Sequence, residues 1–281
     1  MVEKPHRGRV EGKVAIVVGA SRGIGEGIAR DFAKEGARVA MVCSRTIDRA
    51  QKIAEEINQQ YGDERAIAMQ ADSTDEEDVK RMVDETVKVF GGIDILVYSA
   101  GMVRSGSAKT MSLEDFELVT KVNYTGYFLC VKHVAGVMAE QHKRDPSRRM
   151  DIIQINSKSG LQGSSRNAAY AGSKFGGIGL TQSFALELLE DGIKVNAICP
   201  GNYFEGPLWS DPKSGLFMQY LKAGKVPGAK TIEDVRRYYE SKIPLGRGCT
   251  VDDIMHAIYY LIEQQYETGQ AIPITGGQVI R

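Results

Sequence analysis

The sequence predicts an α/β protein with a parallel, seven-stranded, doubly wound sheet covered by helices on both faces. Two observations predict it. Short apolar runs alternate along the chain with longer amphipathic stretches, which is typical of strands joined by crossover helices. The chain has 281 residues, of which 42% are hydrophobic, enough for one large α/β domain with a sizeable core. We therefore expect a single domain over residues 1–281 with right-handed crossovers.

The first half of the chain shows this alternation most regularly. Strands are expected at residues 13–20, 37–44, 66–72 and 94–101. Helices are expected between them, at residues 23–36, 46–62 and about 75–90. In the second helix, isoleucines and alanines recur at helical spacing, which indicates one buried face.

The second half continues the pattern but contains one long irregular segment. A long helix is expected over about 112–141, opened by a capping box of Ser112 and Asp115. A second such box, Thr250 and Asp253, opens the last helix. The segment 202–248 is rich in Gly, Pro and Lys and exceeds a typical loop, so we expect a substrate lobe or lid there. Further strands are expected at 150–157, 193–201 and 270–277, and a further helix from about 168 to 192.

Composition excludes several classes of protein. The formal net charge is zero, which gives no indication of a nucleic-acid or membrane partner, and no apolar run is long enough to span a bilayer. The start, MVEKPHRGRVEGK, lacks the apolar region of a secretory signal. The four cysteines form no CxxC pair and are interpreted as buried thiols in a reducing compartment, and the four histidines lack metal-ligand spacing. We expect a cytoplasmic protein without a metal.

A glycine turn follows the first expected strand. It reads GASRGIG and places Gly19, Gly23 and Gly25 where a helix begins. Glycine permits unusual backbone angles and close approach of a ligand, and the helix start offers free N–H groups to a pyrophosphate. Any tight strand-to-helix turn can use glycines, but this position on the first strand favours dinucleotide binding.

The end of the second strand indicates which dinucleotide is bound. An acidic residue there would bind the adenosine ribose and repel a 2′-phosphate. This chain has Cys43, Ser44 and Arg45 instead, with Arg22 in the glycine turn near enough to contribute. A hydroxyl and guanidinium groups suit a phosphate, so NADP(H) is favoured over NAD(H). The alternative is that both arginines are ordinary solvated surface residues.

The stretch AAYAGSKFGG places Tyr170 and Lys174 one helical turn apart among small residues. The simplest interpretation is a surface pair on an Ala/Gly-rich helix. However, Ser157 ends the preceding strand, so a bound carbonyl group can accept hydrogen bonds from Ser157 and Tyr170 together. The unperturbed tyrosine pKa is about 10, and the Lys174 ammonium and an oxidised nicotinamide are expected to lower it. The pattern thus favours acid/base chemistry on a carbonyl or alcohol.

Several motifs together resemble the short-chain dehydrogenase/reductase family over about residues 11–281. They are the glycine turn, SAG after the fourth strand, VNYTG with Asn123, Ser157, YAGSK, and PG after the sixth strand. The resemblance implies that Tyr170 is the general acid/base, that Lys174 lowers its pKa and binds the nicotinamide ribose, and that Ser157 orients the substrate oxygen. It also implies that Asn123 helps to hold a relay water behind Lys174. It further implies a homotetramer or homodimer that shares the Tyr170 helix and the 112–141 helix.

The same resemblance implies a set of coenzyme contacts. Beside Ser44 and Arg45, the pyrophosphate and adenosine side would be lined by Gly19, Ser21, Arg22, Gly23, Ile24 and Gly25. The adenine would meet Asp72 and Ser73, the ribose Ser99, Ala100 and Gly101, and the nicotinamide Pro200 and Gly201. The chain departs from the family pattern at Val18 and Ser99, where Thr and Asn are usual, and at Glu205, where Thr is common. Glu205 is therefore expected to face the substrate lobe.

Other motifs resemble the sorbitol-6-phosphate 2-dehydrogenase branch of this family, which interconverts a hexitol phosphate and fructose 6-phosphate with NAD. They are LVYSAG, IIQINSKSG, KFGGIGLTQS, PLGRGC and TGGQV. The chain differs from that branch in the lobe and at Arg45. Its expected substrate is an anionic polyol or ketose phosphate. The alternatives are another ketone, such as a 3-oxoacyl thioester or an apolar alcohol, and a non-catalytic dinucleotide-binding protein.

The lobe carries an excess of positive charge that bears on the substrate. Residues 213–247 hold eight basic and three acidic side chains, and Arg104 and Lys158 lie next to the expected catalytic loops. A basic lid suits a phosphate-bearing sugar, whereas a solvated helix face is the simpler interpretation, above all for Arg236 and Arg237. The basic residues are Lys213, Lys222, Lys225, Lys230, Arg236, Arg237, Lys242 and Arg247.

Overall fold

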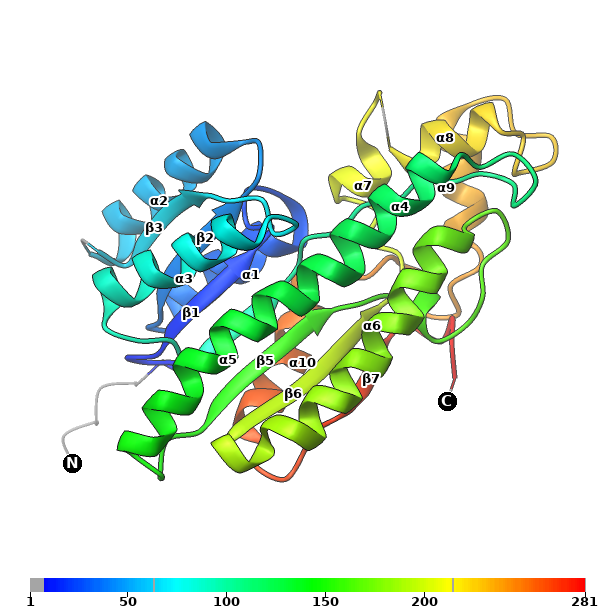
Figure 1. The fold of residues 1–281 in the computed structure, drawn as a ribbon. Helices are drawn as coiled ribbons and strands as arrows, with labels where there is room; N and C mark the ends of the chain where they lie inside the picture. The colour runs from blue at the N-terminus through cyan, green and yellow to red at the C-terminus, as the bar shows by residue number, and fades with distance from the viewer. Residues whose placement is uncertain (1–7, 63, 214, 281) are drawn as a thin grey trace.

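The computed structural model describes residues 8–62, 64–213 and 215–280, and its centre is a seven-stranded parallel sheet (Figure 1). The strand order is β3-β2-β1-β4-β5-β6-β7, so the chain winds outward in both directions from β1 and β4. This confirms the predicted doubly wound sheet. The strands are β1 Val14–Val18, β2 Arg38–Cys43, β3 Ala66–Gln70, β4 Ile95–Tyr98, β5 Met150–Ile155, β6 Ile193–Pro200 and β7 Ala271–Ile274.

Helices cover both faces of the sheet, as expected. One apolar cluster joins a face of the sheet to α1, α2 and α10, and another joins the opposite face to α3, α5 and α6. Figure 1 shows α4, α5 and α6 together on the near side. The large helices are α1 Gly23–Lys34, α2 Ile47–Tyr61, α3 Glu76–Phe90, α4 Leu113–Thr120, α5 Gly126–Arg144, α6 Ala168–Glu187 and α10 Val251–Glu263.

The strands are continuously apolar because both of their faces are buried. In β1, Ala15 and Val17 enter one cluster, whereas Val14, Ile16 and Val18 enter the other. Successive strand side chains point to opposite faces, so a sheet covered on both sides needs apolar residues at every position. This explains why the apolar runs predicted the strands.

The expected long helix over 112–141 is interrupted. A π-helical segment, η1 Lys121–Thr125, separates α4 from α5 and contains the buried Asn123. The Ser112 hydroxyl accepts the Asp115 N–H at 3.1 Å, but the reciprocal bond of a capping box is not found within the described residues. The Thr250–Asp253 box at the start of α10 is complete, as predicted.

The segment 202–248, called the lobe below, is helical rather than irregular. It holds α7 Pro207–Ser210, α8 Leu216–Lys222 and α9 Ile232–Glu240 (Figure 1, yellow to orange). An apolar cluster of its own, separate from those of the sheet, holds these short helices together. The buried centre of this cluster is aromatic: Phe204, Trp209 and Phe217 are in mutual ring contact, and Tyr220 packs edge-on against Trp209.

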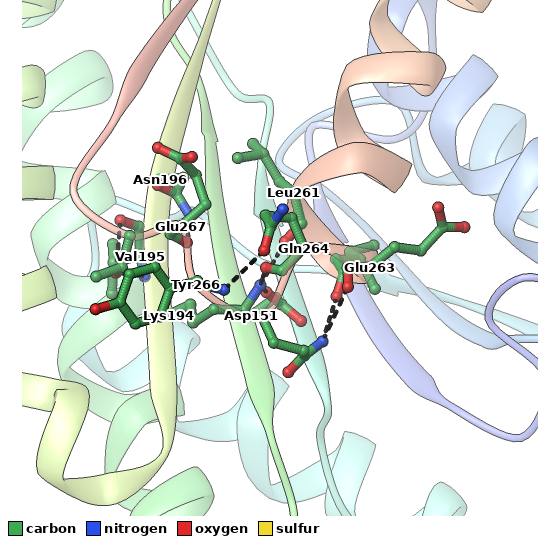
Figure 2. Close-up of polar contacts among 12 residues, drawn as sticks. Asp151, Lys194, Val195, Asn196, Leu261, Glu263, Gln264, Tyr266 and Glu267 are labelled. Carbon is green, nitrogen blue, oxygen red and sulfur yellow. Dashed lines mark hydrogen bonds and ion pairs between the residues drawn. The ribbon is translucent and has the colours of Figure 1, made fainter.

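A buried ion pair lies at the amino-terminal ends of β5 and β6, where these strands meet the end of α10 (Figure 2). Lys194 of β6 faces Asp151 of β5 with Nζ 3.1 Å from Oδ1, and both side chains are almost fully buried. The Lys194 ammonium also donates to the carbonyl oxygens of Leu261 and Gln264 at the C-terminal end of α10. Lys194 thus joins two strands to carbonyls that the helix itself leaves unpaired.

Three expectations, on membrane spans, metal ions and cysteines, can be compared with the described residues. None of their helices has the length and apolar character to cross a membrane. They contain no cluster of potential ligands that would hold a metal ion. Cys43, Cys130 and Cys199 are buried free thiols, as predicted, but Cys249 is only half-buried because it lies where the lobe returns to α10. The expectation on the N-terminal start rests partly on residues 1–7, outside the described residues.

Candidate active site

A cavity of about 880 Å³ opens at the carboxyl ends of the strands and extends under the lobe. The coenzyme-binding residues expected from the sequence all line this one cavity. Of the four expected catalytic residues, Ser157, Tyr170 and Lys174 line it as well, whereas Asn123 does not. A doubly wound sheet binds its ligands at this edge, where the winding direction reverses.

The glycine turn is built so that only glycine fits. Gly19 has a φ of 86°, and a Cβ there would lie 2.8 Å from the backbone nitrogen of Ala100. A Cβ on Gly25 would overlap the carbonyl oxygen of Gly19. Arg22, which directly precedes Gly23, is the N-cap of α1 but makes no side-chain cap, so the first N–H groups of the helix remain available to an anion.

The end of β2 gives the cavity a hydroxyl and a guanidinium. Ser44 and Arg45 line it and are exposed, and so is Arg22 across the glycine turn. Neither arginine forms an ion pair within the described residues. Cys43 precedes them, so the residue at the end of the strand carries no carboxylate.

The two residues expected to contact the adenine differ in how far their side chains are already engaged by other groups. Asp72 is exposed at the cavity, although its carboxylate accepts the Thr74 N–H at 2.9 Å. Ser73 is buried, and its hydroxyl hydrogen-bonds the Tyr98 hydroxyl at 3.2 Å. Ser73 therefore lines the cavity with its hydroxyl already engaged.

Ser157 and Tyr170 are brought together from β5 and α6. Ser157 follows β5 and accepts the Ser159 N–H at 3.1 Å, which fixes its hydroxyl at the start of η2 Lys158–Gly160. Burial raises the pKa of the Tyr170 phenol above its usual value, and hydrogen bonding to Ser157 opposes the rise. Burial therefore dominates in the chain alone, and the expected lowering by Lys174 and an oxidised nicotinamide stays a prediction.

Lys174 lies one turn along α6 and is almost fully buried. Its Nζ donates to the Ile155 carbonyl at 2.9 Å and lies 5.7 Å from the centre of the Tyr170 ring. Burial lowers the pKa of Lys174 to about 8. An ammonium has three donors, so two remain for groups in the cavity.

Asn123 is completely buried behind the cavity, and its side chain acts as a clamp. Its Oδ1 accepts the Met102 N–H at 2.7 Å, and its Nδ2 donates to the Met102 carbonyl at 2.9 Å and the Ser173 hydroxyl at 3.0 Å. It thereby ties the loop after β4 to α6. A Cβ on Gly101 would lie 3.7 Å from Asn123 Oδ1 and 3.9 Å from Lys174 Nζ, so Gly101 borders both side chains. The water-holding role of Asn123 stays a prediction.

The lobe supplies the opposite wall of the cavity. Trp209, Tyr220 and Tyr239 line it, and Tyr170 packs against the same aromatic cluster. Sequence reasoning missed these three residues, although the aromatic density of residues 203–239 was a usable signal. Glu205 also lies in the lobe, as expected, and forms an ion pair with Arg236 at 2.6 Å.

The side chains that line the cavity carry a large excess of positive charge. Among the described residues that line it, seven are lysines or arginines and Asp72 is the one carboxylate. The positive residues divide between the β1–β2 end, with Arg22 and Arg45, and the lobe end, with Lys158 and Lys225. The cavity is therefore suited to ligands with negative charge at both ends. The seven are Arg22, Arg45, Arg104, Lys121, Lys158, Lys174 and Lys225.

These features fit a nicotinamide dinucleotide. The glycine cradle would be filled by any Cβ, the start of α1 is uncapped, and Lys174 has donors to spare beside Tyr170. The same geometry suits hydride transfer to or from a carbon whose oxygen lies against Ser157 and Tyr170.

Comparisons with known proteins agree with this geometry. Residues 13–208 match the short chain dehydrogenase family. The chain is 39% identical to the sorbitol-6-phosphate 2-dehydrogenase of Escherichia coli K12, over 95% of this chain and 99% of that protein. It superposes on the crystal structure of the Erwinia amylovora sorbitol-6-phosphate 2-dehydrogenase with a TM-score of 0.86 at 37% identity, covering 95% and 100% of the two chains.

A third similar protein carries a different name. A variant of the actinorhodin polyketide ketoreductase, solved with NADPH, superposes with a TM-score of 0.85 at 29% identity, covering 97% of this chain and 99% of that one. The relatives thus share the fold and the oxidoreductase chemistry while differing in their named substrates. On the family match and these identities, the chain belongs to the short-chain dehydrogenases, a family of nicotinamide-dependent oxidoreductases.

Proposed function

We propose that this enzyme interconverts a sugar-alcohol phosphate and a ketose phosphate with NADP(H). The observation that carries the proposal is the positive cavity, which has cations at both ends and the Ser157–Tyr170–Lys174 set between them. The similarity to two sorbitol-6-phosphate 2-dehydrogenases supports the substrate class.

The chain's residues have distinct roles in the proposed reaction. When bound, the coenzyme supplies or accepts the hydride. Ser157 donates a hydrogen bond to the substrate oxygen, and Tyr170 gives it a proton during reduction or removes one during oxidation. Lys174, held by the Ile155 carbonyl, places a positive charge beside the phenol and favours the phenolate. Asn123 keeps the loop after β4 in place against α6.

The substrate proposal is tested with a panel of polyols and ketoses, each with and without phosphate. Assays at 340 nm with both coenzymes are expected to show turnover of a phosphorylated member and much poorer turnover of its unphosphorylated form. The preference should weaken as salt is raised, because ions screen the positive cavity. Equal kcat/KM for neutral and phosphorylated forms would overturn the proposal.

The coenzyme proposal rests on Arg45 and Arg22 and on the missing carboxylate at the end of β2. We expect NADP(H) to bind more tightly than NAD(H), and Arg45→Ala to reduce the difference about 10- to 100-fold, since a charge-assisted contact contributes about 1.5–3 kcal/mol. Fluorescence titration of NADPH and NADH measures both affinities. Arg65→Ala is a matched control, because its guanidinium bonds the Gly36 carbonyl away from the cavity. Equal affinities in the parent enzyme would contradict the assignment.

A second candidate is reduction of another ketone. The aromatic wall of Trp209, Tyr220 and Tyr239 favours it, because such a surface also accepts an apolar substrate. The named function of the polyketide ketoreductase supports this alternative. The substrate panel separates the two candidates when an apolar ketone is included.

We also propose assembly into a homodimer or homotetramer. Apolar side chains remain exposed on the helices that the sequence assigned to a shared face, with Phe116 on α4, Phe128 on α5, and Phe175 and Leu186 on α6. Their burial by a second copy would remove a large apolar surface from water. Figure 1 shows these helices side by side on one face of the molecule.

A further inference from the structure

Lys158 lies at the lobe end of the cavity, directly after Ser157, and is half-buried there. Its ammonium makes no hydrogen bond or ion pair with any described residue. Burial, together with the positive charges of Lys225 and Lys242, lowers the pKa of Lys158 to about 8. A charge held in such a place is destabilised until an anion joins it.

Lys225 reaches the same end of the cavity from the lobe. It lies just beyond α8, is half-buried, and places its Nζ 3.9 Å from the centre of the Tyr220 ring. It too has no carboxylate partner among the described residues, and burial lowers its pKa, with the charges of Arg166 and Lys242 adding to this effect. A ring contact orients an ammonium without neutralising it.

Three of the other seven lobe cations are paired with carboxylates. Arg236 pairs with Glu205 and Glu240, Arg237 with Asp234, and Arg247 with Asp253. For Arg236 and Arg237, the simpler interpretation as a helix face holds, because their partners include residues of α9 itself. Of the eight basic residues in the described part of the lobe, Lys225 is the one that lines the cavity.

The two loops that carry these lysines are joined. Arg166, in the loop between η2 and α6, donates to the Ala223 carbonyl at 3.4 Å, two residues before Lys225. Arg166 has a φ of 57°, a left-handed conformation that costs a non-glycine residue energy and is characteristic of functional loops. The strained loop and the lobe therefore meet at the same end of the cavity as the two unpaired ammonium groups.

We propose that Lys158 and Lys225 form the subsite for the phosphate monoester of the substrate. This inference rests on the proposed function and assigns the residues that recognise its phosphate. A phosphate dianion would offset both charges, and it would bridge the loop after β5 to the lobe, closing the cavity over the reacting carbon.

The coenzyme phosphates occupy a different region in this assignment. Lys158 follows β5 and Arg45 follows β2, and these strands are three positions apart in the sheet. At about 4.8 Å per strand, the two ends are separated by about 14 Å. The two cationic ends thus lie at separate parts of the cavity, and we assign them to two different phosphates.

The main test is Lys225→Gln, because Lys225 lies on the lobe and not beside Ser157. We expect kcat/KM for the phosphorylated substrate to fall about 10- to 100-fold, and the preference for it over the unphosphorylated form to fall by a similar factor. Lys158→Gln should act in the same direction. Lys222→Gln is the matched control, since it removes the same charge from the exposed end of α8, outside the cavity, and should keep the preference.

Binding of inorganic phosphate gives a readout that is independent of turnover. Calorimetry with NADP⁺ at saturation, which fills the β2 end, should detect phosphate binding to the parent and to Lys222→Gln, and loss of binding in Lys225→Gln. If phosphate binds in this way but no sugar phosphate is turned over, the subsite stands and the proposed substrate fails. If sugar phosphates are turned over while Lys225→Gln and Lys158→Gln keep both the preference and the phosphate affinity, the subsite is overturned and the proposed function stands.

Discussion

Tyr170→Phe is expected to lower kcat about 10²–10⁴-fold, the usual contribution of a positioned acid/base, while coenzyme affinity stays near that of the parent. The ring remains to pack against the lobe cluster, and only the hydroxyl that exchanges the proton is lost. Turnover is measured with the best substrate of the panel, and NADPH affinity by fluorescence. Tyr266→Phe is the control, because it removes a phenol hydroxyl at a fully exposed position.

The pH profile adds a second criterion for Tyr170. Alcohol oxidation requires the phenolate, so its rate in the parent should rise with pH through the pKa values of the Tyr170–Lys174 pair. Burial raises the pKa of Tyr170, and the hydrogen bond with Ser157 opposes the rise. A charged Lys174 is expected to shift this limb toward neutral pH, because a positive neighbour favours the phenolate. Tyr170→Phe should lose the limb altogether. A variant with most of its kcat and an unchanged pH profile would show that another group is the acid/base.

Lys194→Met is expected to reduce the free energy of unfolding by about 3–5 kcal/mol, the range for breaking a buried ion pair. It leaves the Asp151 carboxylate buried without its partner, and it leaves the Leu261 and Gln264 carbonyls at the end of α10 without their donor (Figure 2). Urea unfolding at a fixed protein concentration measures the loss. Lys13→Met is the control, because Lys13 acts on Asp151 only through its charge.

The ionisation of Asp151 determines how the stability loss of Lys194→Met changes with pH. Burial raises its pKa to about 6, although the Lys194 charge acts in the opposite direction. An acid with a raised pKa in the folded state binds a proton more tightly there, so its contribution to stability falls as pH rises from about 4 to about 6. Without Lys194 the rise in pKa is larger, so the deficit of Lys194→Met should be greater at pH 8 than at pH 5. A deficit that is equal at both pH values, or below about 1 kcal/mol, would contradict this account.

The sheet was predictable because its determinants are local. Each buried strand must be apolar at every position, so an uninterrupted run such as Val14–Val18 marks a strand without knowledge of its neighbours. The glycine turn was predictable for a similar reason, since Gly19 and Gly25 are required by backbone geometry. Ser157, Tyr170 and Lys174 followed from their order along the chain and from the shared edge of parallel strands.

Other features depend on contacts between distant parts of the chain. The apolar pattern continues through residues 121–125, so nothing local separates α4 from α5, and the clamp of Asn123 on Met102 exists only after folding. The lobe helices have four, seven and nine residues, too short for a clear helical period, and are held by ring packing. Lys225 and Arg236 are both basic residues of the lobe, and nothing in the sequence around them shows which of the two faces the cavity. Only the fold gives one of them carboxylate partners and leaves the other facing the cavity.

The separate apolar cluster of the lobe has a consequence for how such enzymes diverge. Its buried members form a group distinct from the two clusters of the sheet, and Tyr170, the proposed acid/base, packs against it. Substitutions in groups that share few contacts add in their effects on stability, so the lobe can accumulate changes without weakening the coenzyme cradle. Selection for a new substrate can then act on one wall of the cavity while the proton-transfer machinery is inherited intact. This independence is consistent with the comparisons, in which one relative is named for a sugar phosphate and another, with the same fold, for a polyketide.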